Sequence, residues 1–373
     1  MLIPFIDLQA QRRRISSEVE KAVMAAVEGG QWIMGPQVRA LEESLAEYAG
    51  VGHCIACANG TDALMIVLRA WEIGPGDAVF VPAFTFAASA EVVALVGAVP
   101  VFVDVFEDTY NLDPKSLEAA MEMVKREGKL KPRAIMPVDL FGQPADYSAI
   151  ELIAAREKLK LLVDTAQAFG ATLDGRQTAA IGGAAGTSFF PAKPLGCYGD
   201  GGATFTNDHA LAELLRSIRV HGQGADKYEN VRIGVNSRLD TIQAAILSEK
   251  LKIFPEEIEM RQRVARRYSE AFRLSNRIRP PHVIEAAKCT WAQYTIQVPD
   301  RDRLAADLKA KGIPTAVYYP TPLSHQKGYA HYPSVGTPVS DRIARHVISL
   351  PMHPYLDDAT QDSIIAAVLE SVA

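Results

Sequence analysis

The chain has 373 residues, of which 48% are hydrophobic and 22% are charged, and its formal net charge is −5. This composition excludes a disordered or fibrous protein, and the mildly acidic charge offers no footprint for nucleic acid or an anionic membrane surface. A chain of this length is expected to divide into two domains.

The N-terminus lacks the features of a secretory signal. Asp7 interrupts the apolar start where a signal peptide needs a continuous apolar stretch, and the basic run 12–14 comes too late to be its charged head. The longest apolar region, residues 78–105, is interrupted by Pro82 and Glu91 and contains no uninterrupted span of ~20 residues. We therefore expect a cytoplasmic protein without a membrane partner.

Two amphipathic helices come first, and short apolar runs alternating with helical segments follow. The helices are expected at residues 16–27 and 36–48, each closed by glycine. Strands are expected at residues 53–58, 78–81, 100–103, 134–138 and 161–163. Nearly continuous apolar strands separated by helices predict a mostly parallel sheet between helices, with ligands beyond the carboxyl ends of the strands.

From residue 238 onward the pattern changes. One long helical stretch, residues 238–271, is expected to kink or break at Pro255. Strands at 294–298 and 314–318 and a terminal helix follow. We therefore predict a large domain of residues 1–245 and a smaller C-terminal α+β domain of residues 246–373.

The four cysteines are too few for a disulfide scaffold. Cys54 and Cys57 have C-x-x-C spacing, but no second Cys/His pair completes a zinc site. They are better interpreted as small core residues of a buried strand, and no metal is expected.

Two residues are candidates for carbonyl chemistry. Lys193 lies in a run of Phe, Pro, Leu and Gly with no charged neighbour until Asp200, and apolar surroundings favour the neutral amine that forms Schiff bases. Asp164 ends an expected strand and is either a helix N-cap or the anionic partner of a pyridinium nitrogen. Gln167, three residues later, could reach the same ligand.

A third candidate is a phosphate cradle. Gly60 and Thr61 follow an expected strand and open a helical pattern, where free N–H groups bind phosphate, although a plain helix cap has the same residues. Phe86 could stack on a planar ring or belong to the core.

Taken together, these features resemble the fold-type I pyridoxal-phosphate enzymes, and specifically the DegT/StrS-type nucleotide-sugar aminotransferases. The resemblance covers essentially the whole chain. It rests on residues 4–8, 30–36, 59–64, 164–167, 188–202 and 234–239. It implies a large domain with a mostly parallel sheet and a smaller C-terminal α+β domain, and it implies pyridoxal 5'-phosphate as the cofactor.

The resemblance also implies a role for each residue of the set. Lys193 would hold the cofactor as a Schiff base and move the proton, while Asp164 would keep the ring nitrogen protonated. Gln167 would bond the phenolic oxygen and Phe86 would stack on the ring. The implied phosphate contacts are Gly60, Thr61 and Ser188. Asn236, a further implied cofactor contact, and Arg238 match residues that reach into the neighbouring subunit, which implies a homodimer with shared active sites.

Within the family, residues 188–202, 231–241, 292–295 and 349–356 most resemble the aminotransferases that act at C3 of UDP-2-acetamido-2-deoxy-3-oxo-glucuronate. This implies glutamate as amino donor and a place in cell-surface polysaccharide or lipopolysaccharide biosynthesis. The implied sugar-nucleotide pocket is Gly30, Trp32, Ala192, Arg238, Tyr318 and Tyr319, with His325 nearby unless it is a plain surface histidine.

Three departures from the family pattern leave the sugar open. Trp32 stands where tyrosine is common, Ala192 where serine often precedes the lysine, and Tyr318 where relatives have histidine. One alternative is an aminotransferase for another UDP- or dTDP-linked 3- or 4-keto-6-deoxy sugar. From other classes, a non-catalytic pyridoxal-phosphate-binding protein stays open, whereas a nicotinamide oxidoreductase is disfavoured because no G-x-G-x-x-G follows an early strand.

Overall fold

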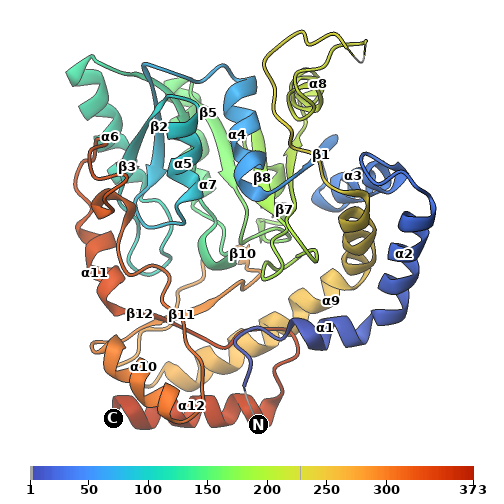
Figure 1. Ribbon diagram of the computed structural model, residues 1–373. Helices are drawn as coiled ribbons and strands as arrows, with labels where there is room; N and C mark the ends of the chain where they lie inside the picture. Colours follow the sequence, from blue (N-terminus) through green and yellow to red (C-terminus); the bar gives the residue numbers. More distant parts are fainter. Residues whose placement is uncertain (1–2, 227) are drawn as a thin grey trace.

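The computed structural model describes residues 3–226 and 228–373 (Figure 1). At its centre lies a seven-stranded sheet with the order β1-β9-β8-β5-β4-β2-β3. The strands are β1 (His53–Cys57), β2 (Asp77–Pro82), β3 (Val99–Val103), β4 (Lys131–Ile135), β5 (Lys160–Asp164), β8 (Ala184–Ser188) and β9 (Gly202–Thr206). Among these strands only β9 runs against its neighbours, so the predicted mostly parallel sheet is confirmed.

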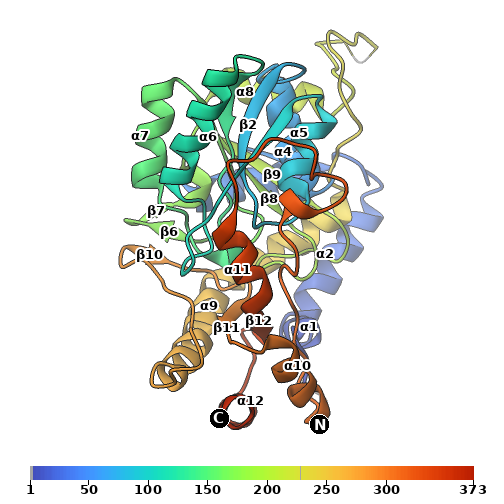
Figure 2. The same ribbon diagram turned by 90° about the vertical axis from the view of Figure 1, so that its left-hand side faces the viewer.

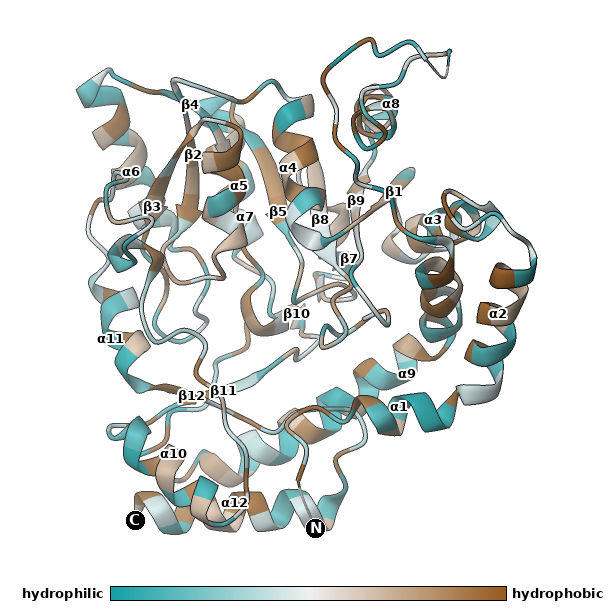
Figure 3. Ribbon diagram, viewed as in Figure 1, coloured by the Kyte–Doolittle hydropathy of each residue, from teal (hydrophilic) through white to brown (hydrophobic). Residues whose placement is uncertain are grey.

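Helices cover both faces of the sheet, as Figure 2 shows from the side. One face packs against α3 (Pro36–Ala49), α6 (Pro114–Glu127) and α7 (Tyr147–Glu157). The other packs against α4 (Gly60–Ala70), α5 (Ala88–Leu95) and α8 (His209–Ile218). The strands are apolar because both of their faces are buried. In Figure 3 the central strands β2 and β5 are accordingly brown, whereas the peripheral helix α1 (Leu8–Arg14) is mostly teal.

A second apolar core lies in the C-terminal part of the chain. It is built from the second half of α9 (Thr241–Phe272), the antiparallel pair β11 (Tyr294–Gln297) and β12 (Val347–Leu350), α10 (Arg301–Ala310) and α12 (Asp358–Val372). The proposed domain boundary at residue 245 lies inside α9, which continues from one core to the other, and it remains a proposal.

Smaller elements connect these units. They are α2 (Ser16–Glu28), α11 (Pro338–His346), a small sheet of β10 (Ala287–Lys288), β6 (Thr172–Leu173) and β7 (Arg176–Gln177), and short 3₁₀ turns at Leu140–Gly142, Thr178–Ala180 and Leu323–His325. Within the described ranges, no helix combines the length and apolar character needed to cross a membrane.

The structure corrects three local details. Helix α9 continues through Pro255, where Phe254 and Glu257 are both buried against the rest of the protein, so the alternative of a break is wrong, while a kink at Pro255 stays a prediction. Residues 314–318 form no strand, since only Ala316 pairs with β12, through Ser349, before the chain turns toward the site. Strand β4 begins three residues earlier than expected, at residue 131 instead of 134.

The two neighbouring cysteines, Cys54 and Cys57, lie on β1 as expected. Because side chains alternate along a strand, residues three apart point to opposite faces. Cys54 belongs to the core under α3, and Cys57 to the core under α4. The two thiols therefore cannot share a metal ion or a disulfide in this fold.

Candidate active site

The predicted catalytic residues converge where the parallel strands end. Asp164 is the last residue of β5, and Ser188 is the last of β8. Gly60 begins α4 shortly after β1, and Lys193 lies in the loop that follows β8. The carboxyl ends of parallel strands meet at one edge of a sheet, so residues far apart in the sequence come together there.

Asp164 is a buried carboxylate, 5% exposed, with both oxygens held by donors. Ser89 Oγ donates to Oδ2 at 2.9 Å, and the Ala166 N–H donates to Oδ1 at 3.1 Å. Burial raises the pKa of Asp164, while these two hydrogen bonds and the positive charge of Lys193 oppose the rise. No helix begins at Asp164, because residues 166–170 form turns, so the helix-cap interpretation is wrong.

Lys193 sits in a loop that is closed by its own backbone. Its N–H donates to the Phe190 carbonyl at 2.8 Å, and at the base of the loop the Cys197 N–H donates to the Phe189 carbonyl at 2.8 Å. Burial lowers the pKa of the Lys193 amine, and the negative charge of Asp164 opposes this. The lowered pKa increases the neutral, nucleophilic fraction of the amine near neutral pH.

The N-terminus of α4 forms an anion cradle. Asn59 caps the helix by accepting the Asp62 N–H at 2.8 Å, and the first N–H groups of a helix have no partner within it. Gly60 is required here, because a Cβ at this position would lie 2.5 Å from Ser188 Cβ. The Ser188 hydroxyl therefore lies directly beside the start of the helix, where it suits a phosphate.

Two aromatic side chains flank this cluster. Phe86 is 57% exposed, so it is not a core residue, and its ring centroid lies 6.3 Å from that of Tyr319. Gln167 accepts the Phe141 N–H at 2.6 Å and donates to the Tyr319 hydroxyl at 3.2 Å. Burial raises the pKa of that hydroxyl, so Tyr319 is a neutral phenol beside the cluster. Gln167 thus links a predicted cofactor residue to a predicted substrate residue.

Other predicted substrate residues lie at the margin of the cluster or away from it. Ala192 directly precedes Lys193 and is half-buried, and Tyr318 packs its ring 6.4 Å from that of Phe5. His325 is exposed, with Nε2 2.7 Å from the Asp341 carboxylate. That contact is enough to account for it as a surface histidine.

Two predicted sugar-pocket residues, and the two residues expected to act across subunits, are not joined to the cluster. Trp32 is 57% exposed and donates through Nε1 to the Val27 carbonyl at 3.1 Å, with Gly30 exposed beside it. Arg238 lines a separate hollow of about 600 Å³ formed with residues 220–223 and 230–234, and Asn236 is exposed next to it. In the described part of the chain, no contact joins Arg238 or Asn236 to Lys193.

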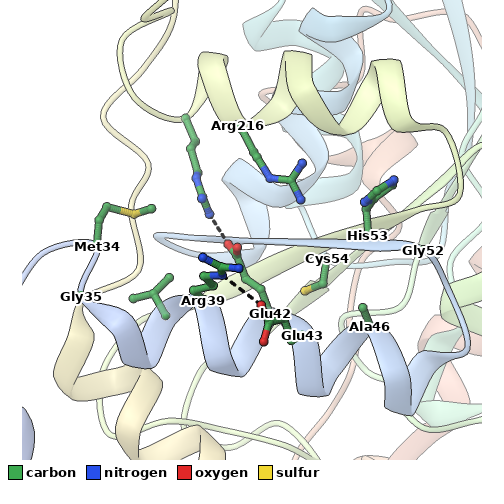
Figure 4. A pocket seen from close by; sticks show the side chains of 12 residues that line it. Met34, Gly35, Arg39, Glu42, Glu43, Ala46, Gly52, His53, Cys54 and Arg216 are labelled. Atoms are coloured by element: carbon green, nitrogen blue, oxygen red, sulfur yellow. Dashed lines mark hydrogen bonds and ion pairs between the residues drawn. The ribbon is translucent and has the colours of Figure 1, made fainter. Parts of the chain in front are cut away.

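A charged groove of about 440 Å³ lies between α3 and α8, along the outer edge of β1 (Figure 4). Glu42 accepts the Ala56 N–H at 2.9 Å, Arg219 donates to the Ala56 carbonyl at 2.6 Å, and the two side chains form an ion pair. These side chains bond the backbone N–H and carbonyl of Ala56 at an edge of β1 that no neighbouring strand covers. The groove contains none of the predicted catalytic residues, and we assign it no part in the chemistry.

Ser89 is a site residue that the sequence reasoning missed. Its hydroxyl is completely buried and orients the Asp164 carboxylate. The available signal was a hydroxyl at the start of α5, a few residues after β2, in an otherwise apolar stretch. Such a side chain needs a buried partner, and the end of a neighbouring strand can supply one.

The donor set fits pyridoxal phosphate. The site offers an oriented carboxylate that suits a ring nitrogen, an amine that suits a carbonyl, and a helix N-terminus with a serine hydroxyl that suits a phosphate. The exposed ring of Phe86 supplies a flat apolar surface.

Comparison with known proteins supports the same assignment. The DegT/DnrJ/EryC1/StrS aminotransferase family pattern matches residues 13–369. The chain is 48% identical, over 98% of its length and 99% of the relative, to the UDP-2-acetamido-2-deoxy-3-oxo-D-glucuronate aminotransferase of Pseudomonas aeruginosa.

Solved structures agree. A DegT DnrJ EryC1 StrS aminotransferase from Brucella abortus is 52% identical with a TM-score of 0.98, covering 100% of both chains. NtdA from Bacillus subtilis, solved with bound PMP, is 28% identical with a TM-score of 0.90, covering 100% of this chain and 85% of its own. The fold class, the aminotransferase class and the pyridoxal-phosphate cofactor inferred from the sequence are thereby confirmed. This chain belongs to the DegT/DnrJ/EryC1/StrS aminotransferase family.

Proposed function

We propose that this aminotransferase transfers the amino group of glutamate to the C3 ketone of UDP-2-acetamido-2-deoxy-3-oxo-glucuronate, in the biosynthesis of a cell-surface polysaccharide. The observation that carries the proposal is the 48% identity, across nearly the whole of both chains, to the Pseudomonas aeruginosa protein that bears this name. The assembled cluster of Asp164, Lys193 and the α4 N-terminus supports transamination as the chemistry.

Bound pyridoxal phosphate supplies an electron sink for the negative charge left on carbon when a proton is removed. The chain's own residues then have distinct tasks. Asp164, oriented by Ser89 and Ala166, holds the proton on the pyridine nitrogen. Lys193, with its lowered pKa, takes the proton from the donor carbon and delivers one to the acceptor.

Binding of the cofactor is a separate task. The N–H groups of Gly60 and Thr61 and the Ser188 hydroxyl hold the phosphate. Phe86, whose ring is exposed, would stack on the ring and exclude water, and Gln167, whose amide donates to the Tyr319 hydroxyl, would bond the phenolic oxygen.

We further propose that the enzyme is a homodimer in which Asn236 and Arg238 complete the neighbouring subunit's site, together with Gly30 and Trp32. Arg238 Nε is buried without a hydrogen-bond partner among the described residues. The same segment exposes apolar side chains, Val231 at 50% and Ile233 at 80%. An arginine fork suits this substrate because it can pair with the sugar carboxylate through two hydrogen bonds.

A direct assay tests the substrate. The enzyme is incubated with glutamate and either UDP-2-acetamido-2-deoxy-3-oxo-glucuronate or a dTDP-linked 4-keto-6-deoxy sugar, and the amino sugar is quantified. We expect turnover of the uronate. Turnover of only the 4-keto-6-deoxy sugar would overturn the substrate assignment, and a yellow protein whose absorbance glutamate does not bleach would be a cofactor binder that does not use glutamate.

A second candidate is the same chemistry on a dTDP-linked sugar. Relatives 38% and 36% identical to this chain bear the names of dTDP-amino-sugar transaminases. Trp32 and Ala192 depart from the family pattern and belong to the implied sugar pocket, so they bear on which nucleotide sugar the enzyme accepts. The lower identity makes this the weaker candidate.

A further inference from the structure

A lysine on α9 is buried without an acidic partner. Lys250 is 2% exposed, and among the described residues no carboxylate lies within 4.0 Å of its Nζ. Burial lowers its pKa to about 8, with Glu257 on the same helix and the Cys197 thiol as the charged or titratable groups that oppose the shift. A buried amine of this kind is costly, and an unbranched apolar side chain of similar length would fill the space without that cost.

The amine has a specific partner in the loop that carries Lys193. Nζ donates to the Gly196 carbonyl at 2.6 Å and lies 4.5 Å from the centroid of the Tyr198 ring. Gly196 packs closely against the start of the loop, because a Cβ there would lie 2.5 Å from the Pro191 carbonyl oxygen. The two limbs of the loop therefore touch, and the position of Gly196 constrains the residues that flank Lys193.

Helix α9 holds the same limb at a second point. Gln243 lies seven residues before Lys250, which places both side chains on one face of the helix. Its Oε1 accepts the Tyr198 N–H at 2.9 Å. Two polar side chains of one rigid helix thus bind a backbone carbonyl and a backbone N–H two residues apart.

We propose that Lys250 is a positioning residue for Lys193. By holding the Gly196 carbonyl, with Gln243 holding Tyr198, it fixes the return limb of the loop against α9 and so aims the Lys193 amine at the cofactor. The inference rests on the role proposed for Lys193. Lys250 would thus affect catalysis only through Lys193, without contacting the cofactor or the substrate.

The test is Lys250→Met, which keeps side-chain length and removes the donor. The matched control is Lys252→Met, because Lys252 is an exposed lysine two residues along the same helix, paired with Glu249. Three readouts are compared with wild type: the dissociation constant of pyridoxal phosphate from the apoprotein, the pH midpoint of the bound cofactor's absorbance, and the single-turnover rate with glutamate. Thermal unfolding is measured alongside.

We expect Lys250→Met to weaken cofactor binding and slow the glutamate half-reaction by about ten-fold, since one charged hydrogen bond is at stake. The pH midpoint should also shift, which a merely structural role would not cause. A folded Lys250→Met protein with all three readouts unchanged overturns the proposal.

If Lys250→Met does not fold, the proposal is tested with Gln243→Leu. Because Gln243 is only half-buried, its replacement disturbs folding less. Its readouts should change in the same direction by a smaller factor, and unchanged values overturn the proposal. Should wild type bind pyridoxal phosphate but not react with glutamate, the proposed donor fails. The absorbance midpoint and the dissociation constant would still report on Lys250.

Discussion

The carboxyl edge of the sheet and the segment around Arg238 differ in how completely one chain builds them. At the sheet edge Asp164 is 5% exposed and has two hydrogen-bond donors. Around Arg238 the side chains line an open hollow, and Ile233 is 80% exposed. The cluster of Asp164, Lys193 and the α4 N-terminus is thus assembled within one protomer, whereas Asn236 and Arg238 lie on a surface that a second protomer is proposed to cover.

The largest expected effect concerns the assembled region. Lys193→Ala should lower transamination by about 10³-fold or more, because both covalent attachment and proton transfer are lost. The measurement is steady-state amino-sugar formation, with the absorbance of bound cofactor recorded in parallel. Lys252→Ala is the control, and activity within ten-fold of wild type in Lys193→Ala would remove Lys193 from the chemistry.

The open region is tested by subunit mixing. Lys193→Ala and Arg238→Ala homodimers should each be inactive, but after unfolding and refolding together about a quarter of wild-type activity should return, since one site in each mixed dimer is intact. In the control, the Lys193→Ala protein is refolded together with the double variant Lys193→Ala/Arg238→Ala, and no activity should return. Absence of recovery in the first mixture would place Arg238 in its own subunit's site.

A smaller effect probes the support of Asp164. Ser89→Ala removes one of its two donors, so the pKa of Asp164 should rise further and its ability to hold the ring proton should fall. We expect the single-turnover rate with glutamate to drop by about ten-fold. Ser44→Ala, which removes a hydroxyl bonded only to its own helix, should leave the rate unchanged.

The last prediction concerns stability rather than activity. Asp139 is completely buried behind Asp164, and burial raises its pKa to about 7 from 3.8. A raised carboxyl pKa stabilises the fold most below about pH 4, and that contribution is lost as the pH rises toward 7. Unfolding free energies of wild type should therefore fall by a few kcal/mol across this window relative to Asp139→Asn. Parallel pH profiles of the two proteins would contradict the assignment.

Sequence reasoning located the residues that carry chemistry better than those that orient them. Lys193 and Asp164 stand in recognisable motifs at the ends of strands, and the fold brings them together as predicted. Ser89 and Lys250 were not recognised, because their partners lie 75 and 54 residues away and only the packed structure shows the contact.

Local backbone patterns failed where tertiary packing decided the outcome. By local rules Pro255 should interrupt a helix. Helix α9 nevertheless continues through it, and the nearby side chains of Phe254 and Glu257 are buried against the rest of the protein. The apolar run 314–318 resembles a strand, but only Ala316 of it pairs with β12. The chain then turns toward the site, where the Tyr319 hydroxyl accepts a hydrogen bond from Gln167.

The antiparallel strand β9 has a consequence for how the protein is made. Strand β1 ends at residue 57, and its strand neighbour, β9, begins at residue 202. During synthesis the chain therefore exposes an apolar, unpaired strand until just over half of it has left the ribosome, and such exposed strands make nascent proteins vulnerable to aggregation. The start of α4 is among the first segments to be translated, yet, because it follows β1, it gains its support only once β9 has been made.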